Sequence, residues 1–283
     1  MAIVNSNQIA KYYDFFRDKE IVFTKANLKA LHIDPRQVYL KCNGGQWPCI
    51  INSSTLQMAK IIIGTGSGAY QEMQKNKDAT VQLKYCFIDQ GNETIHFYVT
   101  CSVQSLEPYQ NTKELSVVTL DFTQRPPDEL IYRIGEFLEA SENFYNRKED
   151  RIDINKNTLR KLGIEKEESV VWIDNVPRRC ILKDLSFSGA KVMLVGVPKF
   201  LVGKPINLKI DFIDTNESII VQGIIPRAEF LEGRKDISSV HIAFNNDVVP
   251  MTYKLHINSF ITTFQKSVLG NQQNAESQTA VSE

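Results

Sequence analysis

The 283-residue sequence lacks the patterns that mark common catalytic and metal sites. It has no HExxH, no GxSxG and no CxxC, and its four histidines, at positions 32, 96, 241 and 256, are dispersed. A lone His in a strand-like segment is more often a hydrogen-bonded structural residue than a base. We therefore predict a protein that is not an enzyme, with no metal site and no cofactor.

An excess of charge of one sign and a long hydrophobic run are also missing. The 33 Lys and Arg residues balance 33 Asp and Glu residues, so no global basic field favours nucleic acid. No stretch approaches about eighteen apolar residues. The start of the chain has neither the basic segment nor the apolar core of a signal peptide. We expect a cytoplasmic protein without membrane insertion, in which any anion site is local.

The five cysteines, at positions 42, 49, 86, 101 and 180, are odd in number and have no regular spacing. Cys is among the most buried residue types, so we interpret the five as reduced thiols, mostly in the core. Cys42 and Cys49 flank a turn-like insert and are close in sequence, which leaves a redox role for this pair as a minor alternative.

Length and residue pattern predict two domains, each with its own core. An amphipathic helix is expected at roughly residues 6–17, and strand-like runs separated by turn signals make residues 1–124 a β-rich lobe. Residues 125–150 are predicted to form a helical linker that two prolines open. Residues 151–269 read as an antiparallel barrel followed by a helix at about 250–268, and the polar residues 270–283 as a disordered tail.

Two short motifs carry the functional prediction. Arg147 and Arg151 form RxxxR, and about thirty residues later Asp184, Ser186 and Gly189 form DxSxxG. A guanidinium is a rigid planar fork that matches a phosphate and also stacks on a flat base. Asp184 can accept from the N–H edge of a guanine, Ser186 can donate or accept, and Gly189 removes a Cβ where a ligand approaches the backbone. Together the motifs predict a site for a guanine-containing ligand with two phosphates.

Each motif alone has a plain structural explanation. The arginines enclose Glu149 and Asp150 and fit a solvated charge run, and the DxSxxG residues are common turn formers. In a chain of this composition random placement gives roughly 0.4 RxxxR matches but only about 0.05 DxSxxG matches. The joint occurrence, in this order and at the entrance to a predicted barrel, favours a ligand site.

At these motifs the chain resembles the PilZ domains, small β-barrels that bind the bacterial second messenger cyclic-di-GMP. The resemblance covers roughly residues 140–268 and rests on the segments RKEDR, KDLSFSGAKVML and SSVHIAFNN. The layout is similar to the two-lobed spirochaetal receptors, in which a PilZ-like N-terminal lobe precedes the binding PilZ domain. The fold class this implies is mainly β with a few helices: two β-barrel-like lobes, the second a six-stranded antiparallel barrel, joined by a helical linker and completed by a C-terminal helix.

The resemblance implies a non-enzymatic, monomeric cyclic-di-GMP receptor. Arg147 and Arg151 would clamp phosphates and stack on guanine, Asp184 and Ser186 would read a guanine edge and hold the loop, and Gly189 would permit close approach. Binding would order the arginine segment and change the geometry between the lobes. The output would be altered contact with an unidentified protein partner, in motility, chemotaxis or virulence regulation.

Two other functions stay open. One is a degenerate PilZ-type interaction module that binds a protein without nucleotide. The other is a nucleotide-cofactor enzyme that uses the Gly64–Gly68 loop, because Gly64, Gly66 and Ala69 fit GxGxxA and Asp89 follows twenty residues later. The segment between them is short and polar, and a meander-like β pattern follows, so a flexible turn between strands is the favoured interpretation.

Overall fold

The computed structural model describes residues 6–76, 79–89, 91, 93–110, 112–147, 150–213 and 215–263. The chain divides into two compact units, Met1–Leu138 and Glu139–Glu283. The division falls within helix α4 (Asp128–Asn146), inside the segment predicted as the linker. The predicted tail, residues 270–283, and the last residues of the predicted final helix lie outside the described residues.

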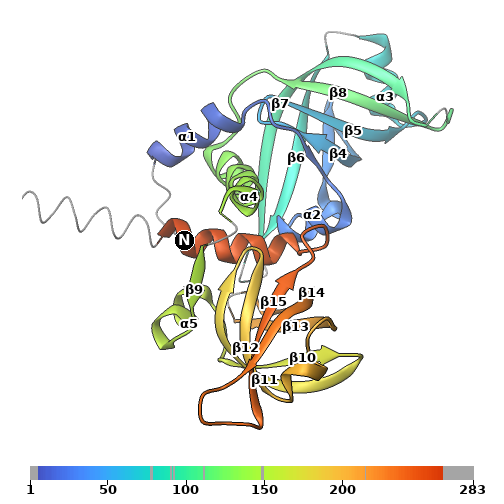
Figure 1. Cartoon of the computed structure of the whole chain (residues 1–283). Helices are drawn as coiled ribbons and strands as arrows, with labels where there is room; N and C mark the ends of the chain where they lie inside the picture. Colours follow the sequence, from blue (N-terminus) through green and yellow to red (C-terminus); the bar gives the residue numbers. More distant parts are fainter. Residues whose placement is uncertain are drawn as a thin grey trace, which may run out of the picture. The chain divides into compact units, whose positions relative to one another are not determined.

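The N-terminal unit is built on an eight-stranded antiparallel sheet with the strand order β1-β4-β5-β8-β7-β6-β2-β3. Strands β4 to β8 of this sheet are labelled in Figure 1. The elements of this unit that precede α4 are α1 (Ser6–Phe16), β1 (Ile21–Val22), α2 (Lys25–Ala30), η1 (Pro35–Gln37), β2 (Tyr39–Cys42), β3 (Gly45–Pro48), β4 (Ile50–Ser54), β5 (Met58–Gly64), α3 (Gly68–Lys75), β6 (Thr80–Ile88), β7 (Thr94–Pro108) and β8 (Leu115–Phe122). The helix predicted at residues 6–17 is confirmed as α1, with Ile9, Tyr12 and Phe16 buried on one face.

The flexible turn predicted after Gly64 is wrong in part, because a helix begins there. Ser67 caps α3 by accepting a hydrogen bond from the backbone N–H of Tyr70 at 3.2 Å, and Ala69 and Met73 are fully buried. These two buried side chains and the Ser67 cap stabilise α3. The helix is too short and too polar for its sequence pattern to predict it. The strand before it, β5, pairs antiparallel with β4 and β8, so the parallel βαβ unit of a dinucleotide-binding fold is not formed here.

Helices α1 and α4 meet at a glycine in the N-terminal unit. A Cβ atom at Gly135 would lie 2.4 Å from Cγ and Cδ2 of Tyr12, a ring that is 1% exposed. We expect Gly135→Ala to lower the free energy of unfolding by about 1–3 kcal/mol, because overpacking outweighs the gain in helix propensity of about 1 kcal/mol. Urea unfolding tests this against Gly66→Ala, since no atom lies within 4 Å of a Cβ at Gly66. Equal stability of the two variants would contradict the close packing of these helices.

The C-terminal unit is a closed antiparallel barrel (Figure 1). The ring order is β10-β13-β14-β15-β12-β11, closed by pairing of β10 with β11, and β9 pairs with the far half of β11. Its elements are β9 (Arg151–Asp153), α5 (Lys156–Leu162), β10 (Glu168–Ile173), β11 (Val176–Ser186), β12 (Gly189–Val195), η2 (Pro198–Phe200), β13 (Pro205–Phe212), β14 (Glu217–Phe230) and β15 (Ile237–Phe244). This confirms the predicted six-stranded barrel.

A final helix covers one end of the barrel (red in Figure 1). It is helical over the described residues 251–263, and Tyr253, Ile257 and Ile261 belong to the barrel core. Phe144, in the last turn of α4, belongs to the same core. Burial of these side chains holds both helices against the barrel, because removing apolar surface from water stabilises the folded protein by about 25 cal/mol per Å².

The cysteine prediction is confirmed, since all five thiols are free and buried. Burial raises the pKa of Cys49, Cys101 and Cys180 to about 12, which leaves these thiols protonated and unreactive. Over the parts of the chain that the structure describes, no group of three His, Cys, Asp or Glu side chains suits a metal ion. No described helix is both long and apolar enough to cross a membrane.

Candidate functional site

Strand β11 is long enough to have two partners along the same edge, and this brings the two sequence motifs together. Its first half, up to Ile181, pairs with β10, and its last residues pair with β9. In that second pairing Ser186 lies opposite Arg151, and Asp184 lies opposite Asp153. The end of RxxxR and the start of DxSxxG are therefore cross-strand neighbours.

The ion pair between Arg151 and Asp184 is the central contact of the site. Nη1 of Arg151 donates to Oδ1 of Asp184 at 2.7 Å. The carboxylate side chain is 12% exposed and the guanidinium 45% exposed, so the pair is accessible from the arginine side. Asp184 is two residues before Ser186, which lies opposite Arg151, so the carboxylate and the guanidinium share one face of the paired strands. The buried carboxylate of Asp184 thus fixes the position of the Arg151 guanidinium.

Ser186 and Gly189 shape the turn between β11 and β12. Ser186 is fully buried, and its hydroxyl donates to the carbonyl oxygen of Gly189 at 3.2 Å. Tyr253 of the final helix donates from its hydroxyl to the carbonyl oxygen of Ser186 at 2.7 Å. A Cβ at Gly189 would lie 2.3 Å from the carbonyl oxygen of Ile242 on β15. In this structure the glycine allows a neighbouring strand to approach, and the serine holds the turn.

Arg147 directly follows α4 and lies at its anchored end. Phe144, one turn earlier, packs edge-to-face on Phe187 within the DxSxxG turn, with ring centroids 6.2 Å apart. Nζ of Lys254 lies over the Phe144 ring, 3.7 Å from its centroid. Nη1 of Arg147 is buried and has no hydrogen-bond partner among the described residues. A buried guanidinium nitrogen without a partner carries an unmet desolvation cost that an anion would relieve.

Two further cations and a histidine lie beside the predicted residues, and the sequence prediction missed them. Lys191 is directly opposite Asp184, His241 opposite Lys191, and Arg227 opposite His241. Strand alternation indicates that Lys191 shares a face with Gly189. The position of His241 and Arg227 beside Lys191 depends on the strand order, which no local sequence pattern predicts.

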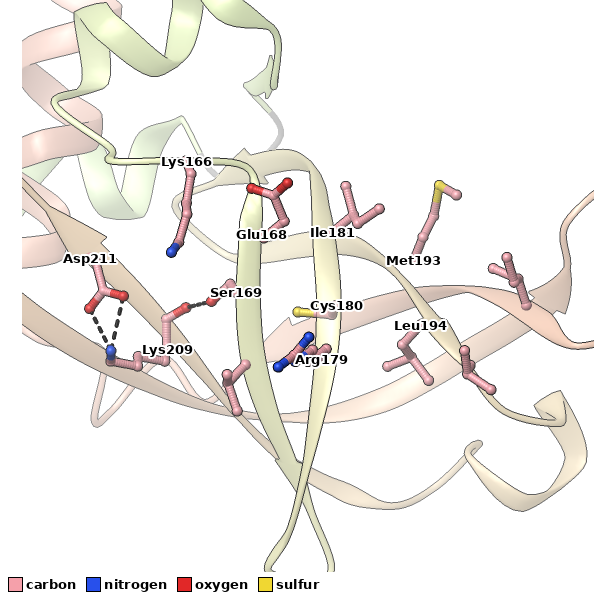
Figure 2. Close-up of a pocket in the computed structure, with 13 residues that line it drawn as sticks. Lys166, Glu168, Ser169, Arg179, Cys180, Ile181, Met193, Leu194, Lys209 and Asp211 are labelled. Atoms are coloured by element: carbon pink, nitrogen blue, oxygen red, sulfur yellow. Dashed lines mark hydrogen bonds and ion pairs between the residues drawn. The ribbon is translucent and has the colours of Figure 1, made fainter.

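A cavity of about 750 Å³ lies elsewhere on the barrel, bordered mainly by β10, β11, β12 and β13 (Figure 2). It mixes apolar side chains such as Ile181 and Met193 with charged ones, including the ion pair of Lys209 with Asp211 at 2.8 Å. None of the five predicted site residues lines it. Of the predicted residues, Arg151 is exposed and Arg147 is partly exposed, whereas Asp184, Ser186 and Gly189 are buried beneath them in the barrel wall.

Comparison with known proteins identifies the family. Residues 7–141 match the model of the PilZN3 domain. A Treponema denticola protein named "Cyclic di-GMP binding protein" is 36% identical over 268 residues, which span 94% of this chain and 85% of the relative. The chain belongs to the two-lobed PilZ proteins. The family resemblance inferred from the two motifs is confirmed, and in this PilZ protein the match to the PilZN3 domain covers the eight-stranded sheet and most of α4.

Two solved structures are similar to this PilZ protein over most of its length. The Borreliella burgdorferi PlzA protein in complex with c-di-GMP is 20% identical, with a TM-score of 0.40, over 90% of this chain and 98% of that chain. Escherichia coli YcgR in complex with c-di-GMP is 16% identical, with a TM-score of 0.30, over 88% of this chain and 92% of that chain.

Proposed function

We propose that this PilZ protein is a non-enzymatic receptor for cyclic-di-GMP. The observation that carries the proposal is the pairing of Arg151 with Asp184 at 2.7 Å, because it joins RxxxR to DxSxxG in one site that is accessible from the arginine side. The unpartnered Nη1 of Arg147 adds a second cation with hydrogen-bonding capacity to spare. The name and 36% identity of the Treponema relative support the same ligand.

In the proposed complex the two arginines bind the phosphates and stack on guanine. Each guanidinium provides a planar fork for a phosphate, and a ligand with two phosphates uses both. Asp184 keeps one oxygen on Arg151 and offers the other to the N–H edge of a guanine. Ser186 holds the turn through Gly189, and Gly189 lets backbone approach the site closely.

The output of binding is proposed to be a change in the geometry between the two units, which alters contact with a protein partner. Helix α4 contributes Leu130, Ile131 and Ile134 to the buried residues before the division at Leu138, and Phe144 to the barrel core after it. Arg147 follows the end of this helix, so an ordered arginine segment can act on α4. Small-angle scattering with and without ligand measures the change. A cytoplasmic location and a monomeric state are part of the proposal.

Isothermal titration tests the receptor function against its two alternatives. We expect saturable binding of cyclic-di-GMP with a dissociation constant of about 1 μM or tighter, which corresponds to about −8 kcal/mol. GTP is expected not to compete, because it lacks the cyclic arrangement of two phosphodiesters.

The Gly66→Ala variant separates the receptor from the cofactor enzyme. A Cβ at Gly66 meets no atom within 4 Å, so the variant is expected to fold and to bind cyclic-di-GMP as the unaltered protein does. Flavin or nicotinamide binding lost in this variant would favour the enzyme. No heat with cyclic-di-GMP for a folded protein would favour the interaction module.

A further inference from the structure

A row of side chains crosses the barrel beside the proposed site. The strand registers set this row: Asp184 on β11 lies opposite Lys191 on β12, Lys191 opposite His241 on β15, and His241 opposite Arg227 on β14. Residues directly opposite on neighbouring strands have Cβ atoms about 4.5–5.5 Å apart. Lys191, His241 and Arg227 are therefore in side-chain reach of one another, next to the carboxylate that holds Arg151.

The row faces away from the barrel core. The chain neighbours of Lys191 and His241 lie in the core, and they are Val192, Val240 and Ile242. Because successive side chains of a strand point to opposite faces, Lys191 and His241 point outward. Both are partly buried, so they form a fixed surface with limited hydration.

The surface is positively charged around a histidine held neutral. Burial lowers the pKa of His241 from its ordinary value, and the charges of Lys191, Arg227 and Arg151 lower it further. Glu229 acts in the opposite direction, but it accepts a hydrogen bond from Nη2 of Arg227 at 2.7 Å. Arg151 is paired with Asp184 and Arg227 with Glu229, so the cations outnumber the anions by one, and Lys191 supplies the excess. Protonation of the imidazole adds to this excess until a further anion arrives.

An unpartnered hydroxyl lies on the same face, two residues before His241. Ser239 is 5% exposed, and its Oγ has no hydrogen-bond partner among the described residues. It lies opposite Met193 on β12 and Glu229 on β14. A buried hydroxyl without a partner is uncommon and costs free energy. The outer face of the barrel thus carries a hydroxyl, that of Ser239, which makes no hydrogen bond to any described residue.

We propose that Lys191, His241 and Arg227 form a second anion subsite that continues the Arg151 site across the barrel, and that His241 takes up a proton when a phosphate of the nucleotide occupies it. The inference rests on the proposed function, since the anion is a phosphodiester of cyclic-di-GMP. The ligand's negative charge offsets the three cations and favours imidazolium. Proton uptake and ligand binding are then linked, and each strengthens the other.

This linkage has a definite sign. Burial and the nearby cations lower the pKa of His241 in the free protein, and the proposed phosphate would raise it in the complex. Binding is then tightest below the free-protein pKa, and it weakens as pH rises through the pKa of the complex. One proton limits the slope to about tenfold in affinity per pH unit. We expect a loss of about threefold to tenfold between pH 6 and pH 8.

Calorimetry in buffers of different ionisation enthalpy counts the protons taken up when cyclic-di-GMP binds. At pH 7 we expect uptake of a fraction of one proton per ligand by the unaltered protein and none by His241→Gln. His96→Gln is the matched control, because His96 is exposed on β7 in the N-terminal unit, and it should match the unaltered protein. Lys191→Gln should weaken binding about fivefold and reduce its dependence on salt.

The possible failures are distinguishable. Binding of cyclic-di-GMP without proton uptake, or with equal uptake in His241→Gln, would overturn the inference and leave the receptor function standing. No binding by the unaltered protein would overturn both. If His241→Gln does not fold, the Cε1–H resonance of His241 in the unaltered protein, followed through a pH titration with and without ligand, decides the matter. An unchanged titration midpoint on ligand addition would refute proton uptake.

Discussion

Replacing both Arg147 and Arg151 with alanine is expected to weaken cyclic-di-GMP binding about a thousandfold, beyond detection in an ordinary titration. Hydrogen bonds to charged groups contribute about 1.5–3 kcal/mol each, and the loss of two arginines removes about 4 kcal/mol. The unpartnered Nη1 of Arg147 predicts that its removal costs little stability, because no described contact to that atom is lost. Removing Arg151 leaves Asp184 without its ion pair, so folding must be confirmed by circular dichroism.

The matched control for this experiment removes two positive charges elsewhere. Arg36 and Arg160 are both exposed, one on η1 and the other on α5, and their double replacement with alanine should leave binding unchanged. Replacement of Arg147 and Arg151 with lysine keeps the charge but removes the planar fork, and it should restore only part of the affinity. Full affinity in the double-alanine variant would show that the ligand binds at another place, or that the motif is a solvated charge run.

The second large effect is expected from Gly189→Ala, which should destabilise the barrel by about 3 kcal/mol. The added Cβ would lie 2.3 Å from the carbonyl oxygen of Ile242, a backbone atom that moves only if β12 and β15 separate. Gly223 on the other side of β15 is comparable, with its Cβ position 2.4 Å from the carbonyl oxygen of Ala243. Both glycines therefore allow close approach of strands within the barrel.

Urea unfolding, with Gly66→Ala as the tolerated control, measures this effect. We expect both Gly189→Ala and Gly223→Ala to shift the midpoint to lower urea, and binding to fall only as far as the folded fraction falls. A Gly189→Ala protein of undiminished stability that fails to bind cyclic-di-GMP would show that the glycine serves the ligand directly. That result would return Gly189 to the role that the motif alone predicts.

Much of the fold was predictable because its signals are local. Period-two alternation in strands such as β6, the helical spacing of Ile9, Tyr12 and Phe16, and the turn residues between strands each depend on a few neighbouring residues. The same holds for RxxxR and DxSxxG, whose order and spacing pointed to a PilZ barrel and to Arg151 and Asp184. Helix α3 escaped prediction because burial of Ala69 and Met73, a tertiary effect, outweighs a weak polar pattern.

By itself the sequence determined the β-rich character of both units, the helix between them, and the family-specific motifs, because covalent order alone encodes these. The tertiary structure decided what lies beside those motifs. Pairing of β9 with the end of β11 places Arg151 on Asp184, and the strand order β11-β12-β15-β14 lines up Lys191, His241 and Arg227 from three separate segments. Cross-strand neighbours depend on which strands pair and in what register, and residues far apart in sequence carry no local trace of that choice.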